Sequence, residues 1–254
     1  MVLKKWILSL CGFIGCYAIQ ANADTRALDI KASASPKECV VLLHGLARTS
    51  DAMSDLDQYL TEAGYHVVNY DYPSREFNIS TLASQHIPLA LEQCGSLSEK
   101  VHFVTHSMGG ILVRYYFEHN TLENLGRVVM LAPPNQGSAV VDNMKNVPGF
   151  KWLNGPAGLQ LGTDANSIPL SLGAVTYETG IIAGTSTINF ILSQFLENPD
   201  DGKVSVESTK VKGMTDHLEV DVSHPFIMKD DEVIRQALYF IQHGQFDSEK
   251  EGMQ

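Results

Sequence analysis

Ser107 stands in a pattern that is typical of a serine nucleophile. A β-branched and aromatic run over residues 101–105 precedes it, and Gly109 and Gly110 follow it at the start of a helix-like stretch. A strand, a sharp turn with serine at its apex and a helix push the hydroxyl out at the top of a sheet, and the strained apex needs small neighbours. The usual pattern has glycine two residues before the serine, where this sequence has Thr105. Because threonine is also small, the pattern predicts a serine nucleophile in a crowded turn.

A serine hydroxyl is a poor nucleophile near neutral pH, so it needs a general base and a carboxylate that orients the base. On this kind of sheet the chain order is serine, acid, histidine. Three histidines lie well downstream of the serine: His217, His224 and His243. His217 precedes the strand expected near residue 220 and would face the wrong end of the sheet, and His243 lies at the end of the last expected helix. His224 follows that strand directly in the loop DVSHPF, so we expect it to be the base.

The expected acid is Asp201. It precedes Gly202 in a tight turn, which can aim a carboxylate inward at the base. Asp200 is the second choice, and Asp216 and Asp221 are weaker ones. Asp221 lies only three residues before the expected base, which favours an alternating strand face over a catalytic position.

Negative charge that develops on the substrate oxygen needs backbone N–H donors. Met108, the residue after the serine, supplies one N–H at the start of a helix, where the helix dipole helps. The loop after the first strong strand supplies the other, because Gly45 permits a tight backbone there and leaves the N–H of Leu46 as donor. We therefore expect Leu46 and Met108 to form the oxyanion hole.

Elements that could position these residues alternate between strand-like and helix-like runs, which favours parallel βαβ units. Pro88 should kink or shorten one of the helices, and Gly64 should end another. The expected strands cover residues 40–43, 65–70, 101–105, 128–131, 180–183 and 220–222, and the expected helices cover residues 51–63, 80–94, 108–119 and 230–243.

Residues 135–179, the cap segment, break this alternation. They are rich in Gly, Asn, Ser and Pro, with scattered apolar residues such as Phe150 and Trp152. A segment of this length inside a compact domain is usually a functional cover or a disordered insert, and the apolar content favours a cover over the site.

The first 23 residues have the features of an export signal. Lys4 and Lys5 precede an apolar stretch, and small residues end at Ala23, where cleavage is expected. An uncleaved membrane anchor is less favoured because the apolar run is short, and a lipoprotein anchored at Cys16 is a minor alternative. We therefore expect a periplasmic or secreted protein, with an N-terminal extension over residues 24–38, one domain over residues 39–244 and a tail over residues 245–254.

Cysteine usage agrees with export. Of the four cysteines, Cys11 and Cys16 fall in the signal, and Cys39 and Cys94 fall in the mature chain. A pair in an oxidising compartment predicts one disulfide. Both cysteines would lie at the amino edge of the sheet if the strands at residues 40 and 101 are neighbours.

The composition argues against several classes of protein. With 254 residues and 44% hydrophobic content, the chain suits one sizeable core. Its formal net charge is −11, and it has no basic stripe or zinc-finger spacing, so nucleic acid is not expected as a partner. No cluster has the spacing of metal ligands, and the chemistry needs neither a metal nor a cofactor.

Six segments together resemble the α/β-hydrolase superfamily and, more narrowly, exported bacterial lipase-like or esterase-like serine hydrolases. They run in the family's order, and the resemblance spans about residues 39–243. The segments are HGLART (44–49), NYDYPSR (69–75), THSMGG (105–110), LAPPNQGS (131–138), DDGKVSV (200–206) and VSHPF (222–226).

The resemblance implies an α/β fold with a mostly parallel central sheet, helices on both faces and a cap insertion. It implies Ser107 as nucleophile, Asp201 as acid and His224 as base, with Leu46 and Met108 at the oxyanion-hole positions. The expected activity is hydrolysis of a small-molecule or lipid ester, with transient contact to a lipid surface as a further expectation. Acyl transfer through the same acyl-enzyme and a non-catalytic exported binding module are the alternatives. The sequence gives no oligomeric state.

Overall fold

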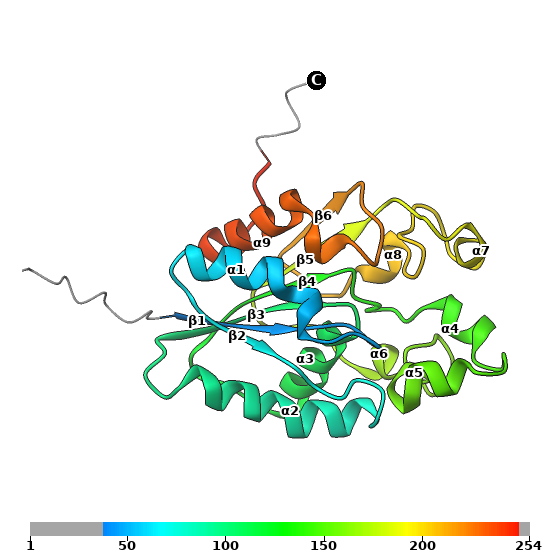
Figure 1. Cartoon of the computed structure of the whole chain (residues 1–254), viewed down its shortest axis with the longest axis horizontal. Coiled ribbons are helices and arrows are strands. Elements are labelled where there is room, and N and C mark those ends of the chain that lie inside the picture. The colour runs from blue at the N-terminus through cyan, green and yellow to red at the C-terminus, as the bar shows by residue number, and fades with distance from the viewer. Residues whose placement is uncertain (1–37, 249–254) are drawn as a thin grey trace, which may run out of the picture. The chain divides into compact units, whose positions relative to one another are not determined.

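The computed structural model describes residues 38–248, which form an α/β fold around a six-stranded sheet (Figure 1). Every strand pair is parallel, and the order across the sheet is β2-β1-β3-β4-β5-β6. The expected export signal, Cys16 within it and most of the expected N-terminal extension lie outside the described residues. Within residues 38–248, no helix has both the length and the apolar character needed to cross a membrane.

The strands that the apolar runs predicted form the middle of the sheet. A parallel strand covered on both faces is a continuous apolar run rather than an alternating one. For this reason β1 (ECVVLL) and β5 (TGIIAG) are buried along almost their whole length. The strands are β1 Glu38–Leu43, β2 His66–Tyr70, β3 Lys100–His106, β4 Leu125–Leu131, β5 Thr179–Gly184 and β6 Asp216–Val220.

Helices cover both faces of the sheet, with α2 and α3 on one face and α1 and α9 on the other (Figure 1). Neighbouring residues of β1 show this division: Val41 packs with Ile79 and Ile111 of the first pair, and Val40 packs with Leu56 and Phe240 of the second. These helices are α1 Ser54–Glu62, preceded by a 3-10 turn at Ser50–Met53, α2 Ile79–Cys94, α3 Met108–His119 and α9 Asp231–His243.

Pro88 does not shorten its helix as the sequence suggested it could, because α2 continues through it to Cys94. Proline removes the N–H that would bond to the carbonyl four residues earlier. That residue is Ser84, which is exposed, so water can satisfy its carbonyl.

The last strand lies earlier than predicted, at Asp216–Val220 instead of residues 220–222. The expectation that His217 precedes the strand is therefore wrong, since His217 lies inside it, and Asp221 lies beyond it rather than on a strand face. The sequence DHLEV obscured this strand because β6 pairs only with β5 and keeps polar residues at the sheet edge.

Cys39 near the start of β1 and Cys94 at the end of α2 form a disulfide, with their Cα atoms 5.7 Å apart. Because β1 and β3 are neighbours, the disulfide lies at the amino edge of the sheet, as the sequence suggested. It therefore ties α2 to the strand layer at the edge opposite the carboxyl ends of the strands.

The cap segment contains three short helices, α4 Ala139–Met144, α5 Phe150–Gly158 and α6 Ile168–Ser171, near the carboxyl edge of the sheet (Figure 1). The buried guanidinium of Arg114 on α3 holds both ends of this stretch. It donates to the backbone carbonyl of Asn135 at one end and to those of Leu172 and Gly173 at the other, over 3.0–3.2 Å. Two further short helices, α7 Phe190–Ser193 and α8 Val206–Thr209, follow β5, and a 3-10 turn at Ile227–Lys229 precedes α9.

Candidate active site

Ser107 lies alone between β3, which ends at His106, and α3, which begins at Met108. Its backbone has φ 53° and ψ −120°, a conformation that costs free energy for any residue with a Cβ. The N–H of Ser107 donates to the carbonyl of Leu131 at 2.8 Å, which helps to hold the turn. The sequence prediction of a strained turn with serine at its apex agrees with this geometry.

The small residues around the turn leave room for the backbone. A Cβ on Gly109 would lie 2.6 Å from the carbonyl oxygen of Leu43, so no larger residue fits there. Thr105 fits where glycine is usual because Gly110 leaves space beside it: a Cβ on Gly110 would lie 3.3 Å from Thr105 Oγ1. The buried hydroxyl of Thr105 donates to the carbonyl of Val129 on the neighbouring strand at 3.4 Å.

The structure brings the three predicted triad residues together. His224 Nε2 lies 3.1 Å from Ser107 Oγ, and His224 Nδ1 lies 2.7 Å from Asp201 Oδ2. All three side chains are buried, and the N–H of His224 also donates to the carbonyl of Asp201 at 3.0 Å. With Nδ1–H bound to a carboxylate, a neutral His224 presents an unprotonated Nε2 to the serine hydroxyl.

Asp201 is held by its own turn. Its Oδ1 accepts the backbone N–H groups of Lys203 at 2.9 Å and Val204 at 2.8 Å, so that Oδ2 remains for His224. Asp200, the second choice, instead accepts from the hydroxyl of Ser193 and from the N–H of Gly202.

The remaining candidates make contacts elsewhere. His217 Nε2 lies 2.9 Å from the hydroxyl of Thr209, and the ring of His243 packs on Tyr239. Asp216 accepts from the backbone N–H groups of His217 and Phe246. None of these contacts involves the serine.

The two expected oxyanion donors are backbone N–H groups without an acceptor in the described part of the chain, at Leu46 and at Met108. Met108 is the first residue of α3, so its N–H points out of a helix N-terminus. The loop that carries Leu46 is fixed on both sides, because Tyr72 Oη donates to the carbonyl of His44 at 2.5 Å and the N–H of Ala47 donates to Ser74 Oγ at 3.1 Å.

His106 is a site residue that sequence reasoning missed. It is buried, and its Nε2 donates to the backbone carbonyl of His224 at 3.2 Å, while the two rings lie 4.9 Å apart. Burial, and then the neighbouring His224 and the positive charges of Lys203 and Arg48, hold the pKa of His106 well below its ordinary value. A neutral His106 thus links the serine turn to the loop that carries His224. The only signal in the sequence was its position next to the serine.

Ser107 and His224 line a cavity of about 290 Å³. Its wall is largely apolar, and two positively charged residues, Arg48 and Lys203, also line it. The cap segment supplies much of the apolar wall through Val140, Val141, Met144, Phe150, Leu153 and Leu161, and α7 adds Leu192.

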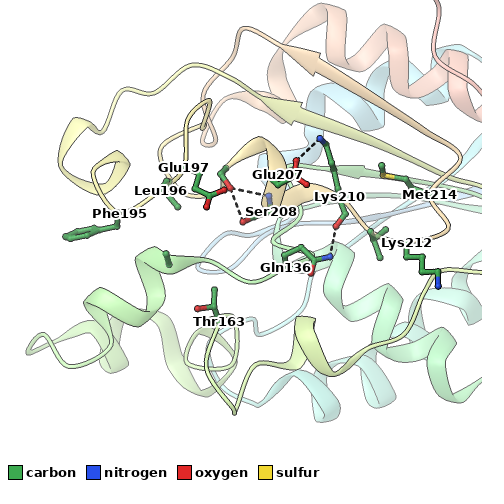
Figure 2. A pocket seen from close by; sticks show the side chains of 13 residues that line it. Gln136, Thr163, Phe195, Leu196, Glu197, Glu207, Ser208, Lys210, Lys212 and Met214 are labelled. Atoms are coloured by element: carbon green, nitrogen blue, oxygen red, sulfur yellow. Dashed lines mark hydrogen bonds and ion pairs between the residues drawn. The ribbon is translucent and has the colours of Figure 1, made fainter.

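A larger and more open hollow of about 690 Å³ lies between the cap segment and the α7–α8 region (Figure 2). Two of its charged side chains are paired, because Lys210 Nζ lies 2.7 Å from Glu207 Oε2, and Gln136 Nε2 donates to the Lys210 carbonyl at 2.9 Å. Among the described residues that line this hollow there is no histidine, unlike at the cavity beside Ser107. Across residues 38–248, no group of three His, Cys, Asp or Glu side chains is arranged to hold a metal ion.

Residues 40–232 match the model of a family described as the alpha/beta hydrolase family. The mature lipase BlEst2 of Bacillus licheniformis is 19% identical, with a TM-score of 0.60 over 81% of this chain and 92% of its own. The Paleococcus ferrophilus monoacylglycerol lipase is 18% identical, with a TM-score of 0.57 over 83% and 96%. The Aspergillus fumigatus lipase B is 17% identical, with a TM-score of 0.61 over 82% and 53%. At these identities the likeness is one of fold.

Proposed function

Because the chain belongs to the alpha/beta hydrolase family, we propose that it is a serine hydrolase that cleaves carboxylic esters through an acyl-enzyme on Ser107. The observation that carries the proposal is the hydrogen-bonded path from Ser107 Oγ through His224 to Asp201, at the wall of a largely apolar cavity. The similar folds of three proteins named as lipases support an ester as the substrate.

In the first half-reaction, Ser107 Oγ attacks the carbonyl carbon of the ester while His224 Nε2 takes the hydroxyl proton. The carbonyl oxygen becomes negatively charged and accepts hydrogen bonds from the N–H groups of Leu46 and Met108. As the intermediate collapses, the bond to the alcohol oxygen breaks and His224 gives its proton to that oxygen. Asp201 stabilises the imidazolium that exists between these steps.

In the second half-reaction, water attacks the acyl carbon and gives its proton to His224. The same oxyanion donors stabilise the second intermediate. The bond between the acyl carbon and Ser107 Oγ then breaks, the serine recovers its proton from His224, and the carboxylic acid leaves.

A lipophilic substrate at a lipid surface suits the surroundings of the cavity. Leu153 of α5 and Leu192 of α7 line the cavity, and the same two helices expose large apolar side chains to solvent. Trp152 is 83% exposed, Phe190 74% and Ile191 72%. Exposed apolar groups of this size beside a pocket are typical of surfaces that contact lipid or another protein.

Export to an oxidising compartment is part of the proposal, since a disulfide persists there and not in the cytosol. The amino terminus of the exported protein, determined by mass spectrometry, should be Asp24. A lipid-modified Cys16 at the amino terminus would contradict cleavage after Ala23.

The test of the activity compares the mature protein with Ser107→Ala. The wild type should react covalently with a fluorophosphonate and hydrolyse p-nitrophenyl esters, and the variant should not be labelled and should lose at least about a thousandfold in kcat. Labelling of the variant, or equal turnover by the two proteins, would rule out Ser107 as nucleophile. A series of acyl chain lengths then distinguishes an esterase from a lipase.

A further inference from the structure

Two positively charged side chains line the cavity beside Ser107. Arg48 comes from the loop after β1, which also carries Leu46, and Lys203 comes from the turn that holds Asp201. Arg48 follows the end of β1, and Asp201 lies against Gly184 at the end of β5, so the fold brings the two cations to the reaction centre from positions 155 residues apart in the chain.

Within residues 38–248, neither the Arg48 guanidinium nor the Lys203 ammonium forms an ion pair, whereas Lys210 pairs with Glu207 and Arg127 pairs with Glu178. Asp201 attracts Lys203, but both Asp201 oxygens are already used, Oδ1 by two backbone N–H groups and Oδ2 by His224.

The two cations also repel each other. Both side chains are exposed to solvent where they line the cavity. Partial burial lowers the pKa of Lys203, and the positive charge of Arg48 lowers it further. Holding two like charges together without a counter-ion costs free energy, and an anion bound between them would recover it.

The protein as a whole is negatively charged, unlike this part of the cavity. The chain has 29 acidic residues against 18 lysines and arginines, for a formal net charge of −11. An anionic substrate is repelled by such a protein at long range, so its binding depends on positive charge placed locally. The remaining wall of the cavity is largely apolar, which suits the hydrocarbon part of an amphiphile.

We propose that Arg48 and Lys203 form an anion-binding subsite. The substrate is then an ester that carries a permanent negative charge, on a phosphate or a carboxylate, near the scissile bond. This inference rests on the proposed ester hydrolysis and names its substrate class. The anion is either a phosphate on the alcohol side of the ester or a carboxylate on the acyl side. Charge-assisted hydrogen bonds from a guanidinium and an ammonium suit both groups.

Two pairs of esters test the proposal, and the members of each pair differ by one added anionic group. The first pair is a monoacylglycerol and its 3-phosphate with the same acyl chain, which places the charge on the alcohol. The second pair is p-nitrophenyl butyrate and mono-p-nitrophenyl glutarate, which places it on the acyl group. Both pairs are assayed with the wild type, Arg48→Met, Lys203→Met and the double variant. Lys212→Met is the matched control, since this exposed lysine lines the other hollow (Figure 2).

The wild type should prefer the anionic ester of at least one pair by tenfold or more in kcat/KM, and that pair identifies the source of the anion. This preference should fall by about ten- to a hundredfold in the double variant, the range for loss of hydrogen bonds to a charged group, and should be unchanged in Lys212→Met. Raising the salt concentration should weaken this preference in the wild type and in Lys212→Met, and should have little effect on the double variant.

The subsite is refuted if the wild type shows no anionic preference in either pair, or if the double variant keeps the wild-type preference. Neither result affects the proposed hydrolysis, which is judged separately by turnover of the neutral esters in the wild type and in Ser107→Ala.

Discussion

Replacing Asp201 with asparagine should abolish most of the activity while preserving the fold, because the turn around residue 201 determines how the new amide must point. In the wild type, Oδ1 accepts two backbone N–H groups, from Lys203 and Val204, and Oδ2 accepts Nδ1–H of His224. Asparagine has one acceptor oxygen and one NH₂ donor. Its oxygen must face the two N–H donors, since the opposite orientation leaves two buried donors unpaired at about 1–3 kcal/mol each.

With the oxygen held there, the NH₂ group of the asparagine faces His224 Nδ1, which must then accept a hydrogen bond. The proton of the neutral imidazole moves to Nε2, the atom 3.1 Å from Ser107 Oγ, and this nitrogen can no longer accept the serine proton. The same change in a serine protease lowers kcat by about 10⁴, which corresponds to about 5.4 kcal/mol in the activation free energy.

The assay measures kcat on a neutral p-nitrophenyl ester together with the rate of fluorophosphonate labelling and the melting temperature. Asp200→Asn is the matched control, because Asp200 accepts from the rotatable hydroxyl of Ser193 and from one N–H. We expect the control to stay within about tenfold of wild type, since a hydroxyl can turn to accept from an amide. The reasoning fails if Asp201→Asn keeps more than a tenth of the wild-type kcat, or if both variants lose activity equally.

Three further predictions concern stability. Removing the disulfide by replacing Cys39 and Cys94 with alanine should lower the free energy of unfolding by about 4 kcal/mol for the 55-residue separation, measured in urea; a loss under about 1 kcal/mol would contradict this. Arg114→Met should lower the free energy of unfolding by about 3 kcal/mol or more and raise KM, because four cap-segment carbonyls lose their donor; unchanged thermal melting and KM would refute it. Burial lowers the pKa values of His44 and His106, so as the pH falls below about 6.5 the unfolded chain takes up their protons before the folded chain does. Stability should then fall with decreasing pH by up to about 1.4 kcal/mol per unit for each, and a flat profile between pH 7 and 5 would exclude this.

The sequence predicted best those strands and turns that depend on a short-range pattern of residues. The continuous apolar runs predicted the buried strands. The glycines after Ser107 predicted a strained turn, and the Ser107 backbone has a positive φ of 53°. The strand β6 was placed wrongly because an edge strand keeps polar residues, so its run DHLEV carries little apolar signal.

Long-range contacts were harder to predict. Local sequence favoured Asp201 over Asp200 because Gly202 follows it, but local sequence does not encode the contact itself. The folded chain shows that the Asp201 carboxylate lies 2.7 Å from His224. Likewise, the bond from His106 to the carbonyl of His224 joins residues 118 positions apart, and no local pattern encodes it.

The parallel sheet gives the molecule two ends with different uses for protein engineering. Ser107 and the loops around it follow the carboxyl ends of the strands, whereas the disulfide and the first residues of β1 and β3 lie at the amino ends. Lys100, the first residue of β3, is exposed at that second end. Attachment to a solid support through this lysine would leave the cavity facing the bulk solution, so the immobilised protein should accept large or aggregated substrates as readily as the free one.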